Sequence, residues 1–175
     1  MVLVMNHKVN VILKPYEYAM ALDVARRRMC SSIMNSSKNN HGFVGHGWEE
    51  NMEGACAELA AAKVLNVYWD GSNETYKEPD IGDFVQVRWA KPHGYSLIVR
   101  NADPSEHAYV LVTGSCPEYV VHGYLYGEDA KQDKWLKGPN GRPSAFFVPN
   151  GNLSPIFDLV DKFESAFRYS INTSK

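Results

Sequence analysis

The segment KEPDIGDFVQVRWA, residues 77–90, decides how this chain is interpreted. A Pro-Asp pair, Pro79 and Asp80, precedes a run in which apolar and polar residues alternate, and this alternation predicts a β-strand. Because side chains of a strand point to opposite faces in turn, Gln86 and Arg88 are expected on the same face. An amide and a cation on one face of an otherwise apolar strand indicate a site that receives charge.

A helix rich in alanine is expected before this strand, over residues 48–67. At the helical period, Glu58 shares its sector with the small and apolar residues Gly54, Ala55, Ala61, Ala62 and Leu65. A carboxylate that faces a core costs several kcal/mol unless it meets a cation, a metal or strong donors. The alternative is that Glu58 lies at the edge of the buried stripe and its head reaches solvent.

These residues together outline a site for metal-dependent hydrolysis. Gln86 lies six residues after Asp80, and Arg88 lies two residues after Gln86. Glu58 lies on a helix that is expected to pack against the same sheet. Oxygen ligands of this kind hold Mg²⁺, and a cation beside them stabilises developing negative charge. In the alternative interpretation, Asp80 and Asp83 are only turn residues, and Arg88 forms a structural ion pair with Glu58.

The segment GACAELAAAKVLNVYWDGSNETYKEPDIGDFVQVRWA, residues 54–90, resembles the core of the PD-(D/E)XK nuclease superfamily. Glu58 matches the helix glutamate, Pro79 and Asp80 match the PD pair, and Gln86-Val87-Arg88 lie where (D/E)-x-K belongs. The chain also resembles small uncharacterised phage and prophage proteins. The resemblance implies a restriction-endonuclease-like α/β fold, with a mixed central sheet flanked by helices, and hydrolysis of DNA that depends on Mg²⁺ or Mn²⁺.

The resemblance also implies roles for individual residues. Asp80, Gln86 and the carbonyl of Val87 would hold the metal, Glu58 would bind it through water or orient the nucleophile, and Arg88 would stabilise the transition state. Two departures matter, since Gln86 offers only a neutral oxygen and Arg88 cannot act as a base. The alternative is an inactive protein of this fold that binds nucleic acid or a host protein, or a phage structural or assembly protein.

Charge and length limit the possible partners. The chain has 175 residues with a formal net charge of -2, so nucleic acid would have to meet a local basic patch. We expect that patch, with an aromatic side chain for stacking, at Lys131, Lys134, Trp135, Lys137 and Arg142. The Arg26–Arg28 run is expected on the solvated face of its helix, and His41 and His46 match no metal-binding pattern.

One domain is expected over residues 1–175, with an N-terminal strand and helix in 1–45, the PD-(D/E)XK-like core in 46–150 and a helix in 151–175. Strands are expected within 66–71, 84–90, 95–100, 108–114 and 119–127. Three widely spaced cysteines predict no disulfide framework, and no apolar run suggests a signal peptide or membrane span. We therefore expect a cytoplasmic protein, located in the bacterial host if a phage encodes it. The sequence leaves two questions open: whether the protein forms a homodimer, and whether it starts at Met1 or at Met5.

Overall fold

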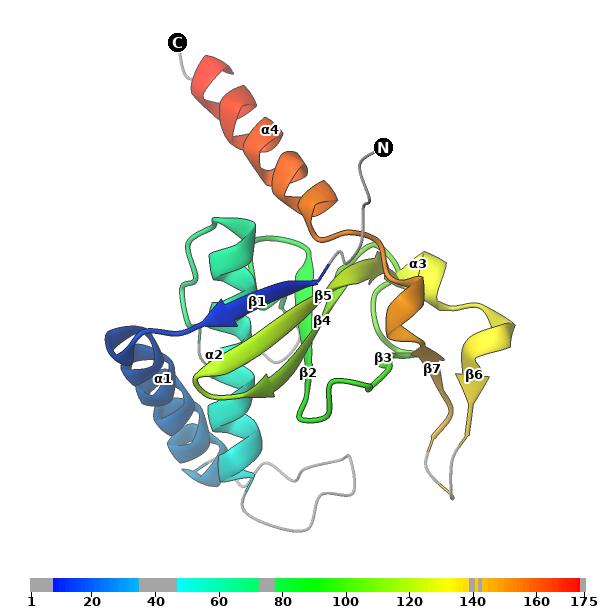
Figure 1. Ribbon diagram of the computed structural model, residues 1–175, viewed down its shortest axis with the longest axis horizontal. Coiled ribbons are helices and arrows are strands. Elements are labelled where there is room, and N and C mark those ends of the chain that lie inside the picture. The colour runs from blue at the N-terminus through cyan, green and yellow to red at the C-terminus, as the bar shows by residue number, and fades with distance from the viewer. Residues whose placement is uncertain (1–7, 35–46, 73–77, 139–140, 142, 174–175) are drawn as a thin grey trace.

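The computed structural model describes residues 8–34, 47–72, 78–138, 141 and 143–173, and within the last range the side chains only as far as 166. Arg142, His41, His46 and both candidate starts, Met1 and Met5, lie outside the described residues. The described part contains four α-helices and two β-sheets, so the expected mixed α/β class is confirmed (Figure 1).

The larger sheet has four strands in the order β1-β5-β4-β2. Neighbouring strands are antiparallel except for β4 and β2, which are parallel, so this sheet is mixed as expected. Its strands are β1 (Val9–Ile12), β2 (Val85–Ala90), β4 (Ala108–Ser115) and β5 (Glu118–Tyr126). A second, antiparallel sheet, which the sequence did not predict, has the order β3-β7-β6 and comprises β3 (Leu97–Arg100), β6 (Leu136–Lys137) and β7 (Ala145–Val148).

The strand expected within 66–71 is wrong. Asn66 ends the preceding helix in a left-handed conformation, φ 54°, and its backbone N–H donates to the carbonyls of Ala62 and Lys63. The chain then runs as an irregular segment in which Trp69 is only 9% exposed. Trp69 is therefore buried by packing in the core beneath the helices and not by pairing in a sheet, whereas Tyr68 is 87% exposed.

The helices cover one face of the larger sheet. Helix α2 (Trp48–Leu65) contacts all four of its strands, and α1 (Pro15–Met34) packs on α2. The buried side of α2 consists largely of alanine, which lets its backbone approach the sheet closely. Helix α4 (Phe157–Thr173) also contacts α2, and α3 (Gly127–Ala130) is a single turn after β5. None of the described helices is long and apolar enough to cross a membrane.

The opposite face of the larger sheet packs on a second apolar core. This core joins Tyr109 and Leu111 of β4 to Leu97 and Val99 of β3 and Val148 of β7. Strand β4 is consequently buried on both faces, in agreement with its nearly continuous apolar sequence. The two faces of the larger sheet thus have different neighbours, helices on one side and the smaller sheet on the other.

Candidate functional site

Glu58 is buried and fully paired, as its position on the core side of α2 predicted. It is 8% exposed, and Arg28 of α1 binds both of its oxygens, with Nη1–Oε1 2.7 Å and Nη2–Oε2 2.9 Å. The indole Nε1 of Trp69 donates to Oε2 at 3.1 Å. The alternative in which Glu58 reaches solvent is wrong, and so is the one in which it pairs with Arg88.

Arg28 corrects the expectation for the Arg26–Arg28 run. Arg26 and Arg27 are exposed and pair with Asp23, as expected, but Arg28 turns inward and its Nε also donates to the carbonyl of Ser72 at 2.9 Å. Burial acts to lower the pKa of Arg28, but the hydrogen bond and charge of Glu58 outweigh it, so the pKa is raised. The sequence carried a signal, because Arg28 directly precedes Met29 of the buried stripe of α1.

Gln86 and Arg88 lie on the face of the sheet away from α1 and α2. In the parallel register they pair with Tyr109 and Leu111, which belong to the second core. Their shared face is as predicted, but Glu58 lies on the other side of the sheet. Gln86 Nε2 donates to the carbonyl of Glu78 at 2.8 Å, which ties this side chain to the segment before Asp80.

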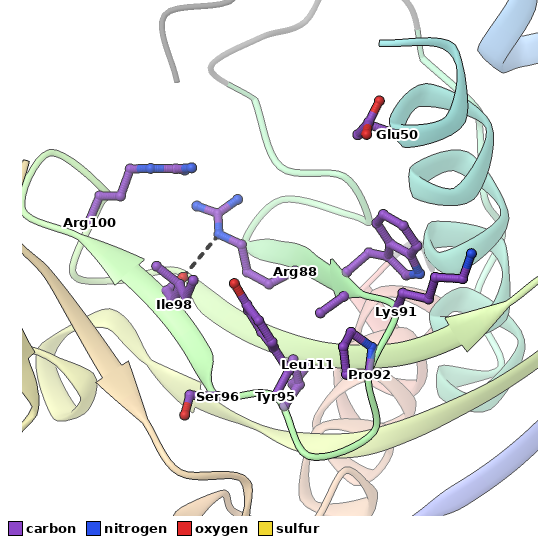
Figure 2. A pocket seen from close by; sticks show the side chains of 11 residues that line it. Glu50, Arg88, Lys91, Pro92, Tyr95, Ser96, Ile98, Arg100 and Leu111 are labelled. Carbon is purple, nitrogen blue, oxygen red and sulfur yellow. Dashed lines mark hydrogen bonds between the residues drawn. The ribbon is translucent and has the colours of Figure 1, made fainter. Parts of the chain in front are cut away.

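The Arg88 guanidinium is held by three contacts. Its Nε donates to the carbonyl of Ile98 at 3.3 Å (Figure 2). Its Nη2 donates to Asp103 Oδ2 at 2.8 Å, and the guanidinium lies over the Tyr109 ring, 5.1 Å from the centroid. Asp103 Oδ2 also accepts the backbone N–H of Arg100 at 2.8 Å. The sequence did not single out Asp103, because an Asp before a Pro in a turn has an ordinary explanation as a turn residue.

A cavity of about 360 Å³ lies beside Arg88, between β2 and β3 (Figure 2). We call it the β2–β3 pocket, and its lining comprises Glu50, Arg88, Trp89, Ala90, Lys91, Pro92, Tyr95, Ser96, Ile98, Arg100 and Leu111. Its lining carries three cations against one carboxylate. The pKa of Arg100 is lowered by burial and by the nearby charge of Arg88, so positive charges are crowded here.

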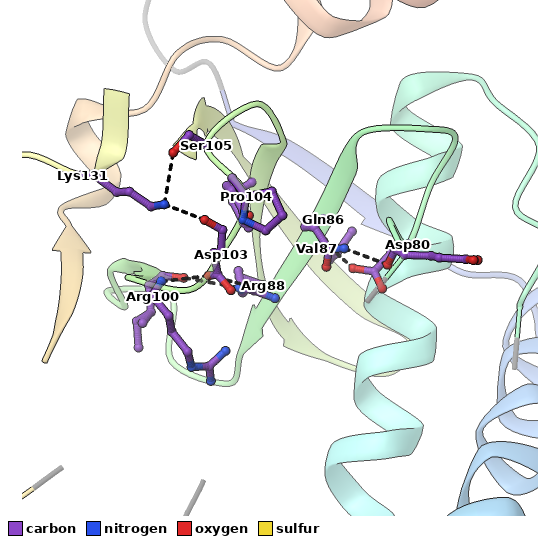
Figure 3. A network of polar contacts seen from close by, with 12 residues as sticks. Asp80, Gln86, Val87, Arg88, Arg100, Asp103, Pro104, Ser105 and Lys131 are labelled. Atoms are coloured by element: carbon purple, nitrogen blue, oxygen red, sulfur yellow. Dashed lines mark hydrogen bonds and ion pairs between the residues drawn. The ribbon is translucent and has the colours of Figure 1, made fainter. Parts of the chain in front are cut away.

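Asp80 covers the free edge of β2. Its backbone N–H and that of Ile81 donate to the carbonyl of Val85, at 2.9 and 3.1 Å, and its Oδ2 accepts the N–H of Val87 at 2.7 Å (Figure 3). The alternation of the strand directs the Val87 carbonyl to the same edge. The Pro-Asp turn therefore takes the place of a further strand, so Asp80 is more than a turn residue.

Asp80 also lies between the two ion pairs. Burial and the charge of Glu58 raise its pKa to about 7, although the Val87 hydrogen bond and the charges of Arg88 and Arg28 act in the opposite direction. A carboxyl group with this pKa exchanges a proton near neutrality, and in its charged form it is a ligand for a cation. The charges of both Glu58 and Arg88 therefore act on the pKa of Asp80, in opposite directions.

The predicted metal ligands are only partly free to bind a metal. Within the described ranges, no three His, Cys, Asp or Glu side chains group as a metal site. Both oxygens of Glu58 accept hydrogen bonds from Arg28, and Oε2 also accepts one from Trp69, so neither oxygen is open to direct metal coordination. Asp80 remains the one carboxylate of the set for direct coordination, which is compatible with a Mg²⁺ ion that keeps most of its waters.

One member of the predicted basic set, Lys131, meets Arg88 at the same turn. Lys131 Nζ donates to the carbonyl of Asp103 at 2.5 Å and to Ser105 Oγ at 3.1 Å (Figure 3). Lys134 Nζ lies 4.3 Å from the centroid of the Trp135 ring, which itself packs on the second core. One face of Trp135 is thus already covered by a cation. Lys137 is exposed on β6.

Comparison of the chain with protein families, with curated proteins and with solved structures finds no match. The geometry of the described residues is therefore the basis for the functional proposals below.

The raised pKa of Asp80 predicts how stability depends on pH. Folding favours its protonated form, so wild-type stability should fall as pH rises from the ordinary value of 3.8 to about 7. Asp80→Asn keeps an oxygen for Val87 and carries no charge. The Tm of this variant should exceed that of wild type by a few degrees at about pH 8, and the difference should vanish near pH 4.

Thermal melts over this pH range measure the effect. Asp83→Asn, an Asp-to-Asn change at an exposed position of the same turn, is the matched control and should give a pH-independent offset. If Asp80→Asn melts below wild type at high pH, the Asp80 carboxylate stabilises the fold and the charge argument is wrong.

The buried ion pair predicts a large cost for removing Arg28. Arg28→Ala leaves Glu58 charged without its main partner, which should lower the free energy of unfolding by about 3–5 kcal/mol. Arg26→Ala removes an exposed arginine of the same helix and should change stability little. Urea unfolding of wild type, Arg28→Ala, Glu58→Ala and the double variant Arg28→Ala/Glu58→Ala measures the coupling energy. If the effects of the two single changes add up to that of the double change, the ion pair is not the cause.

Proposed function

We propose that this protein binds nucleic acid through a basic surface formed by Arg88, Arg100, Lys131 and Lys134. The observation that carries the proposal is the turn at Asp103, which holds Arg88 by its carboxylate and Lys131 by its backbone carbonyl. Arg100 begins the same turn. Of these four cations, only Arg88 forms an ion pair with a carboxylate of the described residues, that of Asp103, so three remain to meet phosphate on a chain whose net charge is -2.

Nucleic acid suits this surface better than a small anion does, because several cations are spread along it. Phosphate contacts from Arg and Lys supply most of the affinity for a polyanion and fix its register. Tyr95 is 42% exposed beside Arg88 and offers a ring on which a base can stack. Arg88 and Lys131 are held in place before a ligand arrives, which lowers the entropy cost of binding.

Binding should depend on salt and on the cations of this surface. Arg100→Gln and Lys134→Gln should each weaken binding of a labelled oligonucleotide several-fold, and the slope of log K against log[salt] should fall by roughly one for each lost phosphate contact. Arg27→Gln removes the same charge from the outside of α1 and serves as the control. Fluorescence anisotropy with single-stranded DNA, double-stranded DNA and RNA measures this; losses equal to that of the control would reject this surface.

Cleavage of DNA is a second candidate function, favoured by the position of Asp80. It shares an edge with the carbonyl of Val87, lies near the charge of Glu58 and is adjacent to the strand that carries Arg88. Asp80, with the oxygens of Val87 and Gln86, would hold Mg²⁺ or Mn²⁺, and Glu58 would contact it through water. The ion would neutralise phosphate charge and activate water. A restriction-endonuclease-like fold of the PD-(D/E)XK type is part of this proposal.

Cleavage is tested with labelled DNA in the presence of Mg²⁺, Mn²⁺ or a chelator. Asp80→Asn should abolish cleavage while the protein stays folded, and Gln86→Glu, which adds a carboxylate, should tighten metal binding measured by calorimetry. Asp83→Asn should leave both unchanged. Salt-sensitive binding without metal-dependent cleavage would support nucleic-acid binding and reject the nuclease.

A further inference from the structure

We propose that the β2–β3 pocket binds a phosphomonoester, carried either by a free nucleotide or by the phosphorylated end of a nucleic acid. The second source rests on the nucleic-acid binding proposed above, whereas the first does not. Binding to a nucleic-acid backbone would use any phosphate along the chain, whereas here a terminal phosphate enters the β2–β3 pocket.

The cations of the pocket come from different elements, and two of them, Arg88 and Arg100, lie together, whereas Lys91 lies apart and pairs with Glu49. Arg88 belongs to β2, Arg100 ends β3 and Lys91 directly follows β2. Figure 2 shows the guanidinium groups of Arg88 and Arg100 directed toward the same region at the opening of the pocket. They are close enough for the charge of Arg88 to lower the pKa of Arg100.

The two arginines leave donors for a ligand. Arg88 uses Nη2 and Nε on Asp103 and Ile98, so its Nη1 has no partner among the described residues. The side chain of Arg100 likewise makes no hydrogen bond or ion pair within the described part of the chain. A guanidinium offers five N–H donors in a planar fork, and two such groups side by side repel each other until an anion lies between them.

Charge and size favour a phosphomonoester over other anions. A phosphomonoester carries close to two negative charges at neutral pH and has three terminal oxygens, whereas a backbone diester carries one charge and exposes two. The cavity of about 360 Å³ is near the lower limit for small-ligand pockets, which suits a single nucleotide. The ring of Tyr95 and the apolar side chains of Pro92, Ile98 and Leu111 line the remainder, where a planar base fits.

The first test is calorimetry with a nucleoside 5′-monophosphate, the matching nucleoside and inorganic phosphate. We expect the monophosphate to bind at least tenfold more tightly than the nucleoside. Arg100→Gln should lose at least tenfold, and Tyr95→Ala should lose several-fold for the monophosphate but little for inorganic phosphate. Arg27→Gln removes the same charge from the exposed side of α1, far from the pocket lining, and should bind the monophosphate as wild type does. Equal binding of nucleoside and monophosphate, or wild-type affinity of Arg100→Gln, would overturn the proposal.

The second test separates the two sources of the phosphate. Oligonucleotides of one sequence with a 5′-phosphate, a 3′-phosphate or only hydroxyl ends are compared by anisotropy in wild type and Arg100→Gln. Preference for a phosphorylated end that Arg100→Gln removes supports the pocket as a site for chain ends. Binding of the monophosphate alone supports the nucleotide and rejects the proposed nucleic-acid binding. Binding of all oligonucleotides alike, without any binding of the monophosphate, keeps the proposed function and overturns this inference.

Discussion

The buried carboxylate of Glu58 is the constraint on which the rest of the structure depends. Helix α2 lies close to the sheet because its buried residues are mostly alanine, and this closeness leaves the charged side chain of Glu58 only 8% exposed. Arg28 and Trp69 supply the donors that water would otherwise give. One side chain therefore fixes the position of α1 and of the irregular segment after α2. The same pairing removes Glu58 from the set of direct metal ligands.

A second constraint is the open edge of β2. A parallel edge strand exposes unpaired backbone groups, and here the Pro-Asp turn satisfies them with the backbone and carboxylate of Asp80. That position brings Asp80 near Glu58, whose charge raises its pKa. The position of Asp80 at the edge of β2 therefore explains both facts: it covers the edge of the strand, and its carboxyl group titrates near neutrality. Asp80→Asn separates these two roles, because asparagine keeps an oxygen that accepts the Val87 N–H but carries no charge.

Local periodicity made the elements and the faces of single residues predictable. The helical period placed Glu58 on the buried side, and the strand period placed Gln86 and Arg88 together, as the structure has them. Partners were not predictable in this way. Arg28 precedes Glu58 by 30 residues and Asp103 follows Arg88 by 15, and neither distance is set by a repeat. The strand expected within 66–71 is wrong because Asn66 ends α2 and Trp69 turns into the core to bond Glu58, a tertiary contact that the local sequence does not indicate.

The arrangement of charge relates the two proposed functions. The Arg28–Glu58 pair is neutral, so the charged form of Asp80 adds negative charge at the edge of β2. The other face, which we call the positive face, carries Arg88, Arg100 and Lys131, and of these only Arg88 forms an ion pair among the described residues, with Asp103. Arg88 of that face is close enough to Asp80 for its charge to act on the pKa of Asp80. Binding needs only the positive face, whereas cleavage needs both, so loss of the Asp80 charge should separate the two activities.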